Sequence, residues 1–195
     1  MQFIAAEDSL LIAAQASGSG TPLIFAHGLS SHHGLTLSQL PPLAPQHRLI
    51  VFDQRGHGAS TPVTDPALYQ PQRMARDMLA VLDALGIERA IVGGESMGAA
   101  TALAFALAHP QRVQALLLTA PAFGDAPNAE CERMVDMGRR LSHLGMAAFL
   151  VEAAERQRTQ LHWGPELIAL VAEMFNRHDA ASLPSRFRRW RSGRR

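Results

Sequence analysis

The pentapeptide Gly94-Glu95-Ser96-Met97-Gly98 is the most informative signal of the fold in this sequence. It follows the short apolar run 90–92 and precedes an alanine-rich stretch that is typical of a helix. A serine on a tight strand-to-helix turn is held in a strained backbone conformation, with its hydroxyl exposed. The residues two positions away on either side must then be small, because the strand and the helix approach each other closely. A helix that begins at Met97 also turns its positive end toward this serine.

Apolar runs and helical stretches alternate on both sides of this turn. Short runs of branched and Leu side chains are typical of buried parallel strands, and apolar residues at helical spacing indicate the helices between them. Two weakly alternating runs around Asp8-Ser9 predict an N-terminal hairpin. We therefore expect an α/β fold, a mostly parallel sheet with helices on both faces. The expected strands are 2–6, 10–15, 23–26, 49–52, 90–92 and 113–119, and the expected helices are 70–85 and 97–109.

Helical spacing continues after Pro121 without any further strand signal. Three consecutive helices are expected, at 131–144, 149–161 and 165–175. Helices appended in this way to a sheet are typical of a lid. The sequence therefore predicts three segments: an α/β core at 1–125, a helical lid at 126–183 and an arginine-rich tail at 184–195.

Two further loops carry chemical signals, and each follows an expected strand. In His27-Gly28-Leu29, the glycine lets the backbone turn so that the Leu29 N–H faces the same cavity as the Met97 N–H. Two such donors form an oxyanion hole, worth about 3–4 kcal/mol per donor in the transition state. The second loop is Asp53-Gln54-Arg55-Gly56-His57-Gly58-Ala59-Ser60. We interpret it as a structural turn held by Asp53 and Arg55.

With these three motifs in this order and spacing, the sequence resembles the α/β-hydrolase fold family. The resemblance runs from the N-terminal hairpin to about Thr119, and the later helices are similar to the family's lid. It implies that Ser96 is the nucleophile and that the backbone N–H groups of Met97 and Leu29 form the oxyanion hole. It also implies that His27 shapes its turn and is not the catalytic base.

The partners of the serine are harder to place. A serine needs a histidine base and an orienting carboxylate, and in this family both follow the serine in the chain. The family's closing strands, with their acid and histidine, have no counterpart after Thr119. Asp125 is the candidate acid, because it follows the last visible strand. None of the later histidines is favoured as the base; they are His109, about 18 Å away along its helix, and His143, His162 and His178 in the lid.

The net charge of +1 hides two parts of opposite sign. All 18 basic residues are Arg, and six of them lie in the last ten positions, where there is no acid. Residues 1–185 hold 12 Arg against 17 acids, a net charge of −5. The tail is interpreted as the product of truncation or a frame shift, which the abrupt change favours, as a basic arm, or as a solvated terminus. An acidic body without a nucleic-acid motif argues against a nucleic-acid partner.

The function expected is hydrolysis of an ester, lactone or similar carbonyl substrate through an acyl-Ser96 intermediate, weakened if the acid and the base are missing. The alternatives are a ligand-binding protein without turnover and a nonfunctional fragment of a longer hydrolase. The partner expected is a small molecule with an apolar acyl group. Lid side chains would supply its pocket, including Met134, Leu141, Phe149 and Met174.

No cofactor, metal or membrane partner is expected. The glycines around Ser96 do not form a dinucleotide-binding or phosphate-binding pattern. The pair His32-His33 lacks a third ligand at a spacing typical of a metal site. The apolar stretches are shorter than the roughly 20 residues that cross a bilayer, and no signal peptide is visible. A single Cys131 fits a reducing compartment, so a cytoplasmic location is expected.

Overall fold

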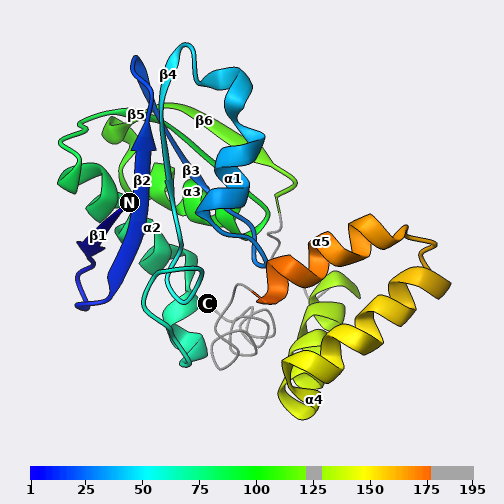
Figure 1. The fold of residues 1–195 in the computed structure, drawn as a ribbon. Helices are drawn as coiled ribbons and strands as arrows, with labels where there is room; N and C mark the ends of the chain where they lie inside the picture. The colour runs from blue at the N-terminus through cyan, green and yellow to red at the C-terminus, as the bar shows by residue number, and fades with distance from the viewer. Residues whose placement is uncertain (122–128, 177–195) are drawn as a thin grey trace.

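The computed structural model describes residues 1–121 and 129–176. Its centre is a six-stranded sheet in the order β1-β2-β4-β3-β5-β6 (Figure 1). The hairpin strands β1 and β2 are antiparallel to each other, β2 is antiparallel to β4, and the pairs among β3 to β6 are parallel. The predicted α/β fold with a mostly parallel sheet is confirmed. The strands are β1 (Gln2–Ala5), β2 (Leu11–Ser17), β3 (Thr21–Ala26), β4 (His47–Phe52), β5 (Ala90–Glu95) and β6 (Val113–Thr119).

Helices connect the parallel strands. Two of them, α2 (Pro71–Ala84) and α3 (Met97–Ala108), lie where helical spacing places them. The sequence did not predict α1 (His33–Gln39), which lies between the expected strands 23–26 and 49–52. Seven residues are too few to show helical periodicity, and this helix starts instead from its N-cap, the His32 side chain. Short 3₁₀ turns complete the connections at Pro41–Leu43, Pro66–Tyr69 and Pro110–Arg112.

Alternating side chains of the inner strands bury both faces of the sheet. In β3, Ile24 packs into a cluster with side chains of α2 and α3, whereas its neighbour Phe25 packs on the other face with Leu40 at the end of α1. The same alternation runs along β4. Because both faces of the sheet are covered, successive side chains of these strands are buried, and the strands are therefore continuous apolar runs in the sequence.

The lid consists of α4 (Ala129–Thr159) and α5 (Pro165–Asn176), which lie together beside the sheet (Figure 1). Gly145, at φ 75° and ψ 166°, breaks α4 into two helical parts, so the three expected helices are present. Both predicted segment boundaries, at 125/126 and 183/184, and the tail itself lie outside the described residues. None of the described helices is long and apolar enough to cross a membrane.

Candidate active site

Ser96 lies at the junction of β5 and α3. Its backbone has φ 52° and ψ −113°, a conformation that costs a residue with a side chain about 1–3 kcal/mol. The two flanking glycines are required by close approach. A Cβ on Gly94 would overlap the carbonyl oxygen of Gly98, and a Cβ on Gly98 would overlap the carbonyl oxygen of Ala26 in β3. Strand, turn and helix therefore meet backbone to backbone around the serine.

The loop after β3 borders the same place. A Cβ built on Gly28 would lie 3.7 Å from the Cβ of Ser96. Met97 is the first residue of α3, so its N–H has no partner within the helix. Among the described residues, no hydrogen bond uses the N–H of Leu29 either. The two backbone donors that the sequence proposes as the oxyanion hole thus belong to the two segments that flank Ser96.

Buried hydrogen bonds hold the Leu29 loop in place. The His27 ring lies with Nδ1 2.7 Å from the Gly28 carbonyl, and its Nε2 accepts the Gln54 N–H at 3.0 Å. The Gln54 side chain donates to the His27 carbonyl and accepts from the Thr101 hydroxyl, both at 2.7 Å. All three side chains are fully buried. Both ring nitrogens of His27 are therefore engaged with backbone, which suits a residue that shapes its turn.

His57 links the second loop to the first. It is buried, with Nε2 2.9 Å from the Leu29 carbonyl and Nδ1 2.9 Å from the Arg55 carbonyl. On either side of it, Gly56 and Gly58 have φ of 71° and 49°, the left-handed region that favours glycine. His57 therefore fixes the carbonyl of Leu29, the residue whose N–H is the proposed oxyanion donor, and this role could not be inferred from the sequence.

Arg55 ties this loop to α2 and to the N-terminal hairpin. Its guanidinium donates two hydrogen bonds of 2.7 Å to Asp77 of α2, and one of 2.8 Å to Asp8. Burial, the largest influence, opposes the charge of Arg55, yet its hydrogen bonds with Asp77 and Asp8 raise its pKa above the ordinary value. Burial also raises the pKa of Asp77, and the pairing with Arg55 opposes that rise.

Asp53 gathers the start of α1 around its carboxylate. It is fully buried and accepts the His33 N–H at 2.7 Å and the Ala59 N–H at 2.8 Å, while His33 Nδ1 lies 2.8 Å away. His32, His33 and Asp53 together place metal-ligand atoms within 4.8 Å of one another. The sequence argument that the histidine pair lacks a third donor is therefore corrected, because the sheet brings Asp53 beside it from 20 residues away. These three residues could hold a metal ion, but their hydrogen bonds to one another and to the backbone already account for the cluster.

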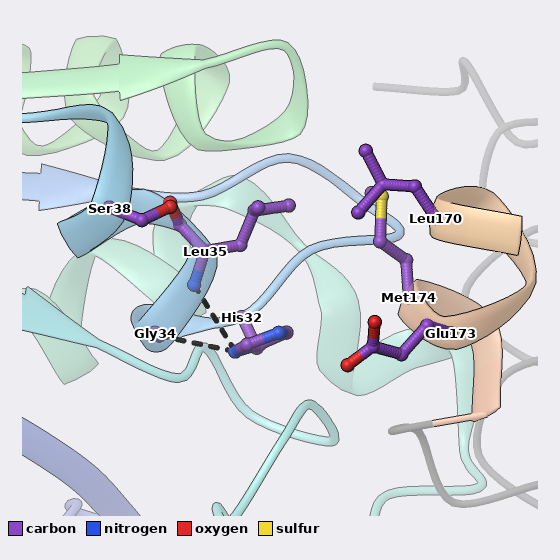
Figure 2. A pocket seen from close by; sticks show the side chains of 7 residues that line it. All are labelled: His32, Gly34, Leu35, Ser38, Leu170, Glu173 and Met174. Atoms are coloured by element: carbon purple, nitrogen blue, oxygen red, sulfur yellow. Dashed lines mark hydrogen bonds between the residues drawn. The ribbon is translucent and has the colours of Figure 1, made fainter. Parts of the chain in front are cut away.

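The lid covers the residues around Ser96. Leu141 and Phe149, two of the expected pocket residues, are buried in one cluster with Leu29 and Met97. Phe175 of α5 joins them. The lid thus packs apolar side chains on the two residues whose N–H groups are the proposed oxyanion donors. Of the other expected pocket residues, Met174 lines a separate cavity (Figure 2), and the side chain of Met134 lies outside the described part of the chain.

The partners of Ser96 are not assembled in the described part of the chain. Within residues 1–121 and 129–176, no hydrogen bond joins the Ser96 hydroxyl to a histidine. His109 caps the far end of α3, as its position in the sequence requires. His143 and His162 lie in the lid region. Asp125, the candidate acid, and His178 lie outside the described residues.

Several known proteins are similar to this chain in sequence or in fold. Residues 21–192 match the model of the alpha/beta hydrolase fold family. The chain is 40% identical over 81 residues to 3-oxoadipate enol-lactonase 1 of Acinetobacter baylyi, across 42% of this chain and 29% of that protein. It is 33% identical over 125 residues to an epoxide hydrolase of Caballeronia sordidicola, across 63% and 38%. The crystal structure of a hydrolase from Pseudomonas aeruginosa PA01 is similar, with a TM-score of 0.77 and 26% identity over 98% of this chain and 72% of that one.

The matches differ in how much of each protein they span. The chain spans 29% and 38% of the two curated relatives, well under two thirds of either. The family match, in contrast, spans most of this chain, from β3 to beyond the lid helices. It includes both loops and the Ser96 turn. The chain therefore belongs to the α/β-hydrolase fold family.

Proposed function

We propose that this chain carries the nucleophile and the oxyanion hole of a serine hydrolase that cleaves an ester, lactone or similar carbonyl compound. The observation that carries the proposal is the strained backbone of Ser96, at φ 52° between two glycines that pack backbone to backbone. Such strain persists only where the surrounding structure enforces it, and here it presents a hydroxyl at the N-terminus of α3. The similarity to an enol-lactonase supports the substrate class.

The chemistry follows from the groups around the serine. The Ser96 oxygen attacks the carbonyl carbon while its proton passes to a solvent water that acts as a weak base, and the carbonyl oxygen becomes an oxyanion. The N–H groups of Leu29 and Met97 donate to that oxyanion, which stabilises it by about 3–4 kcal/mol per donor. The leaving alcohol departs with a proton and leaves acyl-Ser96, which water then hydrolyses to release the acid.

We propose Asp125 as the acid, and we propose that Ser96 works without an effective base, since no histidine within residues 1–121 and 129–176 is hydrogen-bonded to its hydroxyl. Loss of one triad member leaves an acceleration over water of about 10³–10⁴-fold, from binding and the oxyanion hole. We therefore expect weak turnover. The apolar cluster of Leu141, Phe149 and Phe175 over the oxyanion residues favours an apolar acyl group. We propose a cytoplasmic location, which a single cysteine suits.

Labelling with a fluorophosphonate probe tests the nucleophile directly, because the oxyanion hole and the N-terminus of α3 stabilise the negative charge that develops when Ser96 attacks the probe, and this makes Ser96 more reactive than an ordinary serine even where turnover is weak. We expect one label, mapped by mass spectrometry to Ser96 and absent in Ser96→Ala. Ser17→Ala, at an exposed position of β2, is the matched control and should label normally. Labelling that persists in Ser96→Ala, or that never reaches Ser96, would refute the assignment.

A second candidate is a protein that binds a ligand in this pocket without turnover. It is favoured by the Ser96 hydroxyl having no hydrogen bond to a histidine within the described residues. Hydrolysis of an aryl ester separates the two candidates. A rate that falls to background in Ser96→Ala supports the enzyme, whereas no Ser96-dependent rate supports the binding protein.

A further inference from the structure

The carboxylate of Glu95 lies beside the candidate nucleophile. Glu95 is the last residue of β5 and directly precedes Ser96. A Cβ built on Gly28, in the loop after β3, would lie 3.7 Å from the Cβ of Ser96 and 3.8 Å from the carboxyl carbon of Glu95. The serine and this carboxylate therefore border the same space, in front of the loop that carries the Leu29 N–H.

Glu95 is a charged side chain that has given up part of its water without gaining a partner. It is partly buried, and within residues 1–121 and 129–176 no hydrogen bond or ion pair involves its carboxylate. The buried carboxylates of Asp53 and Asp77, in contrast, each accept at least two hydrogen bonds. Removing a charge from water is costly unless the charge is paired. Glu95 therefore gains from a positively charged ligand.

The charge of Glu95 also acts on the proposed chemistry. Ser96 is the N-cap of α3, and the positive end of this helix favours negative charge next to it. Glu95 and an oxyanion held by the Leu29 and Met97 N–H groups are two negative charges at this one helix end, so they repel each other. A substrate that brings a cation to Glu95 offsets this repulsion, whereas a neutral substrate leaves it in place.

The two parts of an ester meet different surroundings here. The apolar cluster that the lid packs on Leu29 and Met97 does not include Glu95. This cluster suits the acyl group, which leaves the charged side of the site to the alcohol part. We propose that the substrate carries an alkylammonium group on its alcohol part, and that Glu95 binds this cation while Ser96 attacks the ester carbonyl. The proposal rests on the proposed function, because it names the substrate class of the same site.

Three butyrate esters measure this preference. Butyrylcholine ends in a trimethylammonium group, 3,3-dimethylbutyl butyrate has a carbon atom in place of that nitrogen and no charge, and 3-(butyryloxy)propanoate ends in a carboxylate. NMR titrations use the isotope-labelled chain with Ser96→Ala, so that no ester is hydrolysed. We expect butyrylcholine to bind about tenfold more tightly than its uncharged counterpart, and the carboxylate ester to bind most weakly. The shifted amide signals should include those of Gly28 and Glu95.

Two glutamate variants, each combined with Ser96→Ala, locate the origin of the preference. Glu95→Gln keeps the size of the side chain and removes its charge, so the preference for butyrylcholine should fall to about twofold or less. Glu88→Gln is the matched control, because it removes the same charge from an exposed position beyond the opposite end of β5. It should leave the preference intact.

Equal affinity for butyrylcholine and its uncharged counterpart would overturn the proposal, as would an unchanged preference in Glu95→Gln or the absence of binding by all three esters. The dispersion of the backbone spectrum shows whether each variant is folded. Glu95→Met, which is also uncharged, replaces Glu95→Gln if that variant does not fold. The proposed function fails by a different result, since the chain that retains Ser96 would then show no Ser96-dependent hydrolysis of any ester, whatever the affinities measured with Ser96→Ala.

Discussion

Asp77→Asn removes the negative charge from a buried ion pair without changing the size of the side chain. The Asp77 side chain is 1% exposed and that of Arg55 is 3% exposed, and two hydrogen bonds of 2.7 Å join them. In the variant, Asp8 is the one anion within residues 1–121 and 129–176 that still has a hydrogen bond with Arg55, and its side chain is 29% exposed. A buried cation then loses most of the charge that compensates for its desolvation.

The expected cost follows from this burial. Removing one member of a buried ion pair destabilises a protein by about 3–5 kcal/mol. The whole stability of a domain is about 5–15 kcal/mol, so the loss is a large fraction of it. For a chain of this size, each kcal/mol of lost stability lowers Tm by about 2–4 °C, so we expect Tm to fall by about 6–20 °C.

The Asp77→Asn substitution should also lower the reactivity of Ser96. Arg55 is followed by His57, whose ring joins the carbonyls of Arg55 and Leu29, each at 2.9 Å. A looser Arg55 loop should therefore release the Leu29 carbonyl, so that Leu29, including the N–H of its preceding peptide bond, is held less firmly toward the oxyanion. We expect fluorophosphonate labelling of Ser96 to slow about tenfold or more, at a temperature where the variant is folded.

Thermal unfolding followed by circular dichroism measures the first effect, and the labelling rate measures the second. Glu155→Gln, which removes an exposed partner of Arg158, is the control and should leave both unchanged, since solvent screens that pair. Arg55→Met combined with Asp77→Leu should recover much of the lost Tm, because no charge is then left buried at this pair. A Tm within 2 °C of the wild type for Asp77→Asn would refute the reasoning.

Two further predictions concern the same scaffold. Gly94→Ala should lower the free energy of unfolding by about 1–3 kcal/mol and abolish labelling of Ser96, because the new Cβ overlaps the Gly98 carbonyl oxygen. Gly164→Ala is the control and should label normally, because a Cβ at that position meets open space. Equal labelling of the two variants would contradict the close approach at Gly94. Thr101→Val should cost about 1–3 kcal/mol in chemical unfolding, because the buried Gln54 oxygen loses its donor; an unchanged midpoint would show that the hydrogen bond contributes nothing.

Local pattern was enough for the strands and for the serine turn. Apolar runs such as 23–26 and 49–52 are continuous because the sheet is covered on both faces. Such runs can be recognised in the sequence without knowing which strands lie beside them. The turn at Ser96 can be recognised in the sequence because its two glycines are required by contacts within five residues and with one adjacent strand. Short α1 was missed for the opposite reason, since its seven residues carry no periodic signal and its cap is a histidine.

The α/β class, the position of the candidate nucleophile and the lid helices could therefore be predicted from the amino-acid sequence. The contacts that hold the site depend on the tertiary structure. Asp53 meets His33, His57 meets Leu29 and Arg55 meets Asp77 across separations of 20 to 28 residues. These pairs form because β4 lies beside β3 and carries its loop to the same end of the sheet, with α2 alongside. Hydrogen bonds and ion pairs depend on distances of about 3 Å, and a linear pattern contains no such distance until the strands have been ordered.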